Sequence, residues 1–105
     1  MTRLDQLKQF AAEEPDDPFN YYALALEYLK SNPDEAQGIF KNLLISHPDY
    51  LPTYSPYAQL LAERKENALA EQTFQNGIEE AKRAGDVKTM RELQAALFDW
   101  QYLRE

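Results

Sequence analysis

The sequence predicts an all-α protein built from antiparallel helix pairs, and three observations support this prediction. Strand signals are almost missing, because no stretch alternates polar and apolar residues over a useful length and β-branched residues are few. Capping residues and helix-stopping prolines recur at short intervals along the chain. One stretch of helix pattern also repeats later in the chain, with a shift of 33 to 34 residues.

Caps and stops predict three helices in the first half of the chain. Thr2 begins the first helix as the start of a capping box, and Pro15 ends it because proline cannot continue a helix. Asp17 caps a second helix, with proline in the first helical position, and this helix runs to about Lys30. An Asn-Pro pair repeats the same device and begins a third helix over about 33–46.

Three more helices are predicted in the second half. Pro52 and Thr53 start a fourth helix, and Pro56 is tolerated in it because first-turn N–H groups are unpaired. Asn67 caps a fifth helix, and Gly85 ends it as a left-handed terminator. Asp86 then caps a last helix whose apolar residues follow a 3- and 4-residue spacing. Six helices on short turns account for the whole chain.

The clearest pattern in the chain is its internal repeat. The segment that begins at Pro15 aligns with the segment that begins at Pro48, with a shift of 33. Downstream the shift is 34 and aligns Phe40 with Phe74, which a one-residue deletion in the first inter-helix turn explains. The N-terminal helix joins the same register, since Leu7 aligns with Phe40.

A helix-turn-helix repeated at this period resembles the tetratricopeptide repeat family. The first repeat matches the family pattern with Tyr21, Leu24, Ala25, Tyr28, Ala36, Phe40 and Pro48. The second repeat matches it with Tyr54, Tyr57, Ala58, Leu61, Ala70 and Phe74. Alanine replaces the family's glycine, and Gly77 stands where alanine or leucine is usual. Lys82 replaces the second proline, which predicts that the fifth helix runs past the usual stop.

The resemblance implies a small bacterial-type protein, folded as a right-handed superhelical α-solenoid of about six helices. We expect a single domain over residues 1–105. Its expected parts are an N-terminal half-repeat helix at 3–15, a first repeat at 18–50, a second repeat at 51–84 and a C-terminal capping helix at 86–104. The two terminal helices act as lids in this prediction, because a repeat cannot bury its apolar face alone.

Composition and charge exclude several classes of function. The chain carries 11 basic and 18 acidic residues, and its net charge of −7 disfavours binding to nucleic acid or to an anionic membrane surface. It has no cysteine and a single histidine, His47, which is interpreted as a helix cap. The acidic residues over 13–17 are interpreted as caps and solvated charges. We therefore expect no catalytic residue, metal or cofactor, and cytoplasmic location is the default.

The second predicted helix carries a second apolar stripe that the repeat core does not use. This stripe either packs on neighbouring helices or, as the resemblance implies, faces a concave groove that holds a peptide or a partner's helix. The implied groove residues are Phe19, Tyr22, Leu26, Leu29 and Lys30 from the first repeat, and Ser55, Gln59, Ala62 and Glu63 from the second. Family members that clamp a carboxylate carry Lys, Arg and Asn at these places. Here Tyr22, Leu26 and Pro56 occupy them, so no carboxylate clamp is expected.

The function expected from this pattern is a non-enzymatic scaffold that binds a protein or peptide by apolar contacts. The alternative is a structural protein that self-associates as a homodimer through its last helix. That helix ends in an apolar run that is wide for a lid, with Phe98, Trp100 and Leu103 as the expected contact residues. An enzyme is the weakest hypothesis, because only His47 and scattered acids support it.

Overall fold

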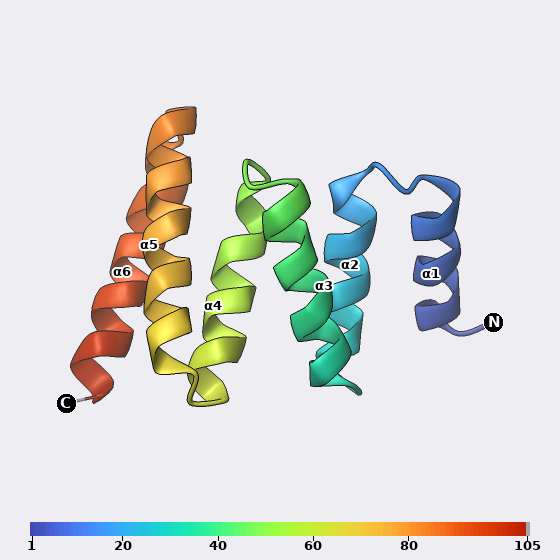
Figure 1. The fold of residues 1–105 in the computed structure, drawn as a ribbon, viewed down its shortest axis with the longest axis horizontal. Helices are drawn as coiled ribbons and strands as arrows, with labels where there is room; N and C mark the ends of the chain where they lie inside the picture. Colours follow the sequence, from blue (N-terminus) through green and yellow to red (C-terminus); the bar gives the residue numbers. More distant parts are fainter. Residues whose placement is uncertain (105) are drawn as a thin grey trace. The chain divides into compact units, whose positions relative to one another are not determined.

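The computed structural model describes residues 1–104, and this part of the chain is all-helical (Figure 1). Its elements are α1 (Arg3–Glu13), α2 (Pro18–Tyr28), α3 (Pro33–Ser46), a 3-10 turn η1 (Leu51–Thr53), α4 (Tyr54–Glu63), α5 (Asn67–Ala84) and α6 (Val87–Arg104). The chain divides into two compact units. The first unit ends at Thr53 and contains α1 to α3, and the second begins at Tyr54 and contains α4 to α6.

Side-chain caps fix the helix starts of the first unit as the sequence predicts. The Thr2 hydroxyl accepts a hydrogen bond from the Asp5 N–H at 3.1 Å, and the Asp5 carboxylate accepts one from the Thr2 N–H at 3.3 Å, which completes the capping box. The Asp17 carboxylate accepts from a first-turn N–H of α2 at 3.0 Å, and the Asn32 side chain does the same for α3 at 3.3 Å. Each cap satisfies a backbone donor that the helix itself leaves unpaired.

Two helix starts in the second half differ from the prediction. The fourth helix begins at Tyr54, after the 3-10 turn over Leu51–Thr53, and not at Pro52. Proline fits the first turn of either helix type, so the sequence pattern could not separate them. Asn67 is the first residue of α5 and not its cap. The cap position belongs to Glu66, which makes no side-chain capping hydrogen bond.

The junction between α5 and α6 follows the prediction. Gly85 adopts the left-handed conformation, with φ at +73°, and ends α5. The Asp86 carboxylate accepts hydrogen bonds from the Thr89 N–H at 3.0 Å and the Thr89 hydroxyl at 2.8 Å, which caps α6. With 18 residues, α5 is longer than α3 with 14, as expected where Lys82 replaces a proline.

The same small and aromatic positions form the core of each unit. The alanines predicted at close helix crossings are fully buried, namely Ala25 and Ala36 in the first unit and Ala58 and Ala70 in the second. Phe40 and Phe74 are the largest fully buried side chains of their units. Small residues let two helix backbones approach closely, and the two rings fill the space beside them.

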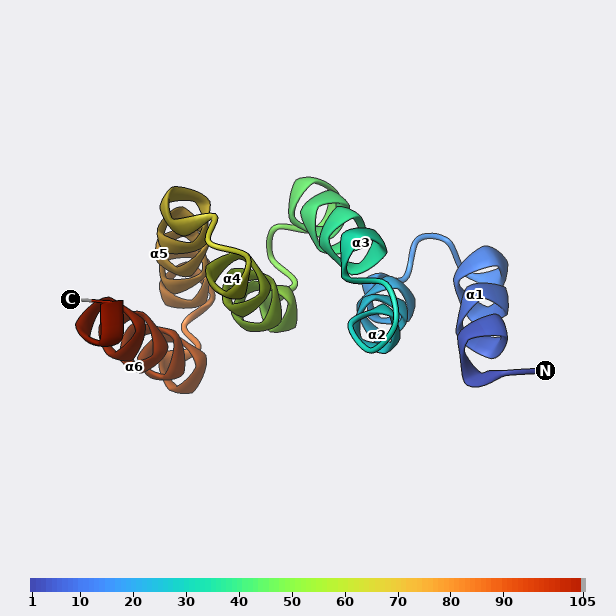
Figure 2. The same cartoon turned by 90° about the horizontal axis from the view of Figure 1, so that it is seen from below.

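Within each unit the middle element contacts its two neighbours. In the first unit α2 lies between α1 and α3 (Figure 2), and α1 buries Leu7 and Ala11. In the second unit α5 packs against both α4 and α6. The α6 helix buries Leu93 and places the Trp100 ring 6.0 Å from the Phe74 ring, measured between centroids.

Candidate functional site

The α2 helix is apolar along most of its surface, and its two polar residues hold α1. Its sequence contains only Asn20 and Glu27 among aliphatic, aromatic and proline residues. The Asn20 amide donates a hydrogen bond to the Phe10 carbonyl oxygen at 3.4 Å, near the end of α1. The Glu27 carboxylate forms ion pairs with Arg3 of α1 at 3.6 Å and with Lys30 at 3.0 Å. This side of α2 is therefore committed to binding α1.

A second face of α2 is also occupied within the first unit. Leu24 and Ala25 are buried, and they are the only buried residues of α2. At the edge of this face the Lys8 ammonium lies 5.7 Å from the centroid of the Tyr28 ring, a cation–π contact that adds to the α1–α2 interface. The two packed faces together use Leu24, Ala25 and Tyr28, three of the four α2 residues that the repeat pattern assigned to the core.

The remaining face of α2 is an apolar stripe that stays partly exposed. We call Phe19, Tyr22 and Leu26 of α2, with the C-cap residue Leu29, the α2 stripe; their spacing of 3, 4 and 3 residues places them on one face. Phe19 is 57% exposed, and the other three are half-buried. Apolar patches that remain exposed on one helix face are typical of interaction surfaces. The stripe therefore meets the first requirement for a docking surface.

One member of the α2 stripe is held in place by a second tyrosine. The Tyr22 and Tyr50 rings meet edge to face, with centroids 5.8 Å apart and an interplanar angle of 64°. Burial raises the pKa of the Tyr50 hydroxyl, and the neighbouring Tyr22 and Asp17 raise it further. The Tyr50 hydroxyl therefore stays uncharged at neutral pH, which suits contact with an apolar partner.

The residues predicted from the second repeat form a more polar surface on α4. Gln59 is exposed, and its amide donates a hydrogen bond to the half-buried Ser55 hydroxyl at 3.1 Å. Ala62 is half-buried and Glu63 is exposed. Lys30, the last residue predicted from the first repeat, is exposed and pairs with Glu27. That these residues share one groove with the α2 stripe stays a prediction.

The residues predicted for self-association divide into two groups on α6. Phe98 is 66% exposed and Leu103 is 80% exposed, and Tyr102 beside them is also exposed. Trp100 is half-buried, because it packs on Phe74 and carries the Arg104 guanidinium 4.3 Å from its ring centroid. Trp100 thus takes part in the α5–α6 packing, whereas the exposed side chains form an apolar edge. Self-association through this edge stays a prediction.

The structure gives the lone histidine a structural place. His47 is the C-cap residue of α3, and its N–H donates a hydrogen bond to the Leu43 carbonyl oxygen at 2.7 Å. Within residues 1–104, no group of three or more His, Cys, Asp or Glu side chains is arranged to bind a metal ion. None of the helices described is both long and apolar enough to cross a membrane.

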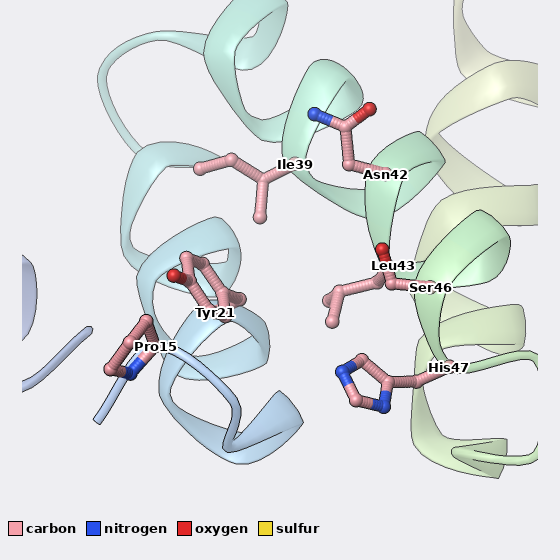
Figure 3. A pocket seen from close by; sticks show the side chains of 7 residues that line it. All are labelled: Pro15, Tyr21, Ile39, Asn42, Leu43, Ser46 and His47. Carbon is pink, nitrogen blue, oxygen red and sulfur yellow. The ribbon is translucent and has the colours of Figure 1, made fainter. Parts of the chain in front are cut away.

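The first unit also contains a pocket that the sequence pattern did not indicate (Figure 3). It has a volume of about 260 Å³ and is lined by Pro15, Tyr21, Ile39, Asn42, Leu43, Ser46 and His47. The sequence had assigned Tyr21 to the core of the first repeat. The signal that could have indicated the pocket is the alignment of Leu43 with Gly77, since one repeat carries a bulky side chain where the other has none.

Several solved structures are similar to this chain. No protein-family model matches the chain, and no curated protein matches it significantly. The solution structure of a tetratricopeptide repeat domain protein from Salinibacter ruber is 37% identical, covers 86% of this chain and 92% of its own, and superposes with a TM-score of 0.81. A crystal structure of a tetratricopeptide repeat domain protein from the same organism is 38% identical, covers 83% and 99%, and gives a TM-score of 0.78. A protein from Bordetella parapertussis, 21% identical with 97% and 90% covered, shares the fold with a TM-score of 0.80.

Proposed function

The chain belongs to the tetratricopeptide repeat family, and we propose that it is a non-enzymatic module that binds a peptide or a helix of a partner protein. The observation that carries this proposal is the α2 stripe. Both polar residues of α2, Asn20 and Glu27, hold α1, and the face left over is apolar and partly exposed. When a partner covers such a surface, apolar area leaves water and the free energy of the system falls.

The size of the α2 stripe indicates how strong such binding would be. Each ~100 Å² of apolar surface that a partner covers contributes about 2.5 kcal/mol at the usual coefficient. Association itself costs at least about 4 kcal/mol in lost translational and rotational freedom. The stripe alone therefore supports weak binding, and tight binding needs further contacts.

We propose that those further contacts come from the predicted groove residues of α4 and from Lys30. The hydroxyl of Ser55 and the amide of Gln59 can exchange their mutual hydrogen bond for bonds to a peptide backbone. The half-repeat, two repeats and capping helix predicted from the sequence remain our proposed division of the chain. With Tyr22, Leu26 and Pro56 at the places of the family's clamp, the proposed groove reads an apolar segment and not a terminal carboxylate.

The experiment that tests this proposal is capture of partners from a native lysate, followed by mass spectrometry. The wild-type chain is compared with a Tyr22→Asp/Leu26→Asp double variant, and circular dichroism confirms that helix content is retained. A Tyr102→Asp/Leu103→Asp variant on the exposed edge of α6 carries the same added charge and serves as the matched control. We expect the partner to be lost only from the α2 variant. Retention of the same partners by that variant would contradict the assignment.

A second candidate function is self-association through α6. The observation that favours it is the exposed apolar edge of Phe98, Tyr102 and Leu103. Sedimentation analysis over a range of protein concentrations tests it, with Phe98→Asp as the variant. A dimer that dissociates in the variant would support the second candidate, and a wild-type monomer at the highest concentration would exclude it.

A further inference from the structure

Aliphatic and ring-containing side chains line much of the pocket of the first unit (Figure 3). Leu43, which is 3% exposed, and the half-buried Ile39 line it from α3. Pro15 and Tyr21 line it from the α1–α2 turn and from α2. Four apolar or aromatic side chains therefore border one hollow, a composition that is typical of sites for apolar groups.

The rim of the pocket is polar and uncommitted. Asn42 and Ser46 are exposed, and His47 is half-buried. None of these three side chains hydrogen-bonds another residue within the described part of the chain. They can therefore bond to the backbone of an incoming polypeptide without breaking an internal bond. No aspartate, glutamate, lysine or arginine lines the pocket.

Acidic residues adjoin the pocket in the sequence on two sides. Glu14 and Asp16 flank Pro15, and Asp49 follows His47 by two residues. Residues 1–53 carry four basic and nine acidic residues, a net charge of −5, whereas the remaining residues carry a net charge of −2. The surroundings of the pocket therefore favour a positively charged partner.

We propose that this pocket binds one aromatic side chain of a partner polypeptide that carries lysine or arginine next to it. The volume of about 260 Å³ suits one large side chain, and the Tyr21 ring can pack against an aromatic group. A cation inside the pocket would lose its hydration with no carboxylate beside it. A cation on the neighbouring residue stays in water and meets the acidic turn outside the rim.

This site is separate from the α2 stripe. Tyr21 and Tyr22 are successive residues, so their side chains leave the helix about 100° apart. The pocket adds an anchoring point beyond the proposed groove, and each site can fail or succeed without the other. A Leu26→Asp substitution on the stripe is accordingly expected to leave pocket binding unchanged.

The test is a titration of the full chain followed by two-dimensional amide NMR, with three capped dipeptides as probes. The probes are acetyl-Phe-Arg-amide, acetyl-Phe-Glu-amide and acetyl-Gly-Arg-amide. We expect acetyl-Phe-Arg-amide to shift the amide signals of Ile39, Leu43 and His47, with a Kd of about 1 mM or weaker because the probe is small. Acetyl-Gly-Arg-amide should bind at least about tenfold more weakly, since it lacks the ring. Acetyl-Phe-Glu-amide should also bind more weakly than acetyl-Phe-Arg-amide. Added salt should reduce the difference in Kd between these two probes, because it screens their charges.

Two substitutions on one turn of α3 decide whether the pocket itself is responsible. Ser46→Phe places a ring at the rim and should abolish the saturable shifts. Ile45→Phe adds the same ring at a neighbouring position that is 71% exposed, and it should leave them intact. Because Ser46 is also exposed, both variants are expected to fold, which their spectra report directly. Equal effects of the two variants, equal binding of the Arg and Glu probes, or shifts centred on Tyr22 and Leu26 would each overturn the proposal.

Discussion

The two helix pairs, α2–α3 and α4–α5, share one repeat pattern but bury it to different extents. The α2 helix buries only Leu24 and Ala25. The α4 helix is shorter by one residue and buries five side chains, namely Tyr54, Tyr57, Ala58, Leu60 and Leu61. The same pattern of aromatic and small residues therefore gives a well-buried helix in α4 and a partly exposed helix in α2.

A single position accounts for part of this difference. Tyr54 is buried against Gly77, where an added Cβ atom would lie 2.7 Å from the Tyr54 Cβ. The aligned pair in the first unit is Tyr21 and Leu43, and there the tyrosine stays half-buried beside the pocket. A glycine lets the ring lie directly on the helix backbone, whereas a leucine holds it away. The residue at this position, glycine or leucine, thus distinguishes a sealed contact from an open pocket.

The largest effects are expected from the two buried phenylalanines. Phe40→Ala and Phe74→Ala should each lower the free energy of unfolding by about 3–5 kcal/mol, as cavities in a packed core do. Phe74→Ala should cost about 1 kcal/mol more, because the ring contact with Trp100 is lost too. Urea unfolding of both variants measures the difference. Equal losses would indicate that the α6 contact adds nothing to the second unit.

Gly77, which aligns with Leu43 of the first unit, gives the next largest effect. Gly77→Ala should lower the free energy of unfolding by about 2 kcal/mol, because the new Cβ overlaps Tyr54 and meets Leu93 at 3.0 Å. Gly38→Ala is the matched control on α3, where an added Cβ meets nothing within 4 Å. That control should gain up to about 1 kcal/mol from helix propensity. A stabilised Gly77→Ala variant would refute the role given to Gly77.

A smaller effect of opposite sign is expected at one of the two buried threonines. Within the described residues the Thr53 hydroxyl is buried without a hydrogen-bond partner, whereas the Thr73 hydroxyl donates to the Leu69 carbonyl oxygen at 2.8 Å. Thr53→Val should therefore raise the free energy of unfolding by about 1 kcal/mol, because an unpaired polar group leaves the interior. Thr73→Val should not stabilise the chain. Chemical unfolding of both variants tests this contrast, and a destabilised Thr53→Val would contradict it.

The smallest effect concerns a cap that titrates. Hydrogen bonds from the Thr89 backbone N–H and hydroxyl hold the pKa of the Asp86 carboxyl below its usual value. The folded pKa is thus lower than the unfolded one, so the stabilisation is present above the unfolded pKa and is lost as pH falls through the folded pKa. Asp86→Ala should lower the melting temperature at neutral pH, and this difference should disappear in acid. Asn32 caps α3 without an ionisable group, so the loss in Asn32→Ala should persist across the same pH series.

Local chemistry predicted most of the fold, and longer-range packing decided the rest. Helix caps and terminators depend on a few neighbouring residues, so the sequence pattern predicts them. The caps at Thr2, Asp17 and Asp86 and the terminator Gly85 are of this kind. The predicted cap of α5 was wrong by one residue. Asn67 is of a residue type that often caps helices, but here it is the first residue of the helix. Repeat periodicity located the buried alanines, since their spacing follows from the helix pairs.

The candidate site was predicted less completely, and the reason is physical. The sequence pattern identified the α2 stripe by its spacing, but it did not indicate that Asn20 and Glu27 would both be used to hold α1. The pocket depends on how the turn at Pro15, the ring of Tyr21 and the side chain of Leu43 meet across the unit. Such contacts join residues far apart in the chain, and helix periodicity carries no information about them.

The ring of Trp100 gives the second unit an optical label of its own. It is the only tryptophan of the chain, and it packs on Phe74 under the Arg104 guanidinium. Its emission should therefore change when α6 leaves α5, whereas far-ultraviolet circular dichroism reports helices of both units at once. If the two signals follow one curve during denaturation, the repeats melt cooperatively; if they separate, the gap between the midpoints measures how independently each half of the array holds together.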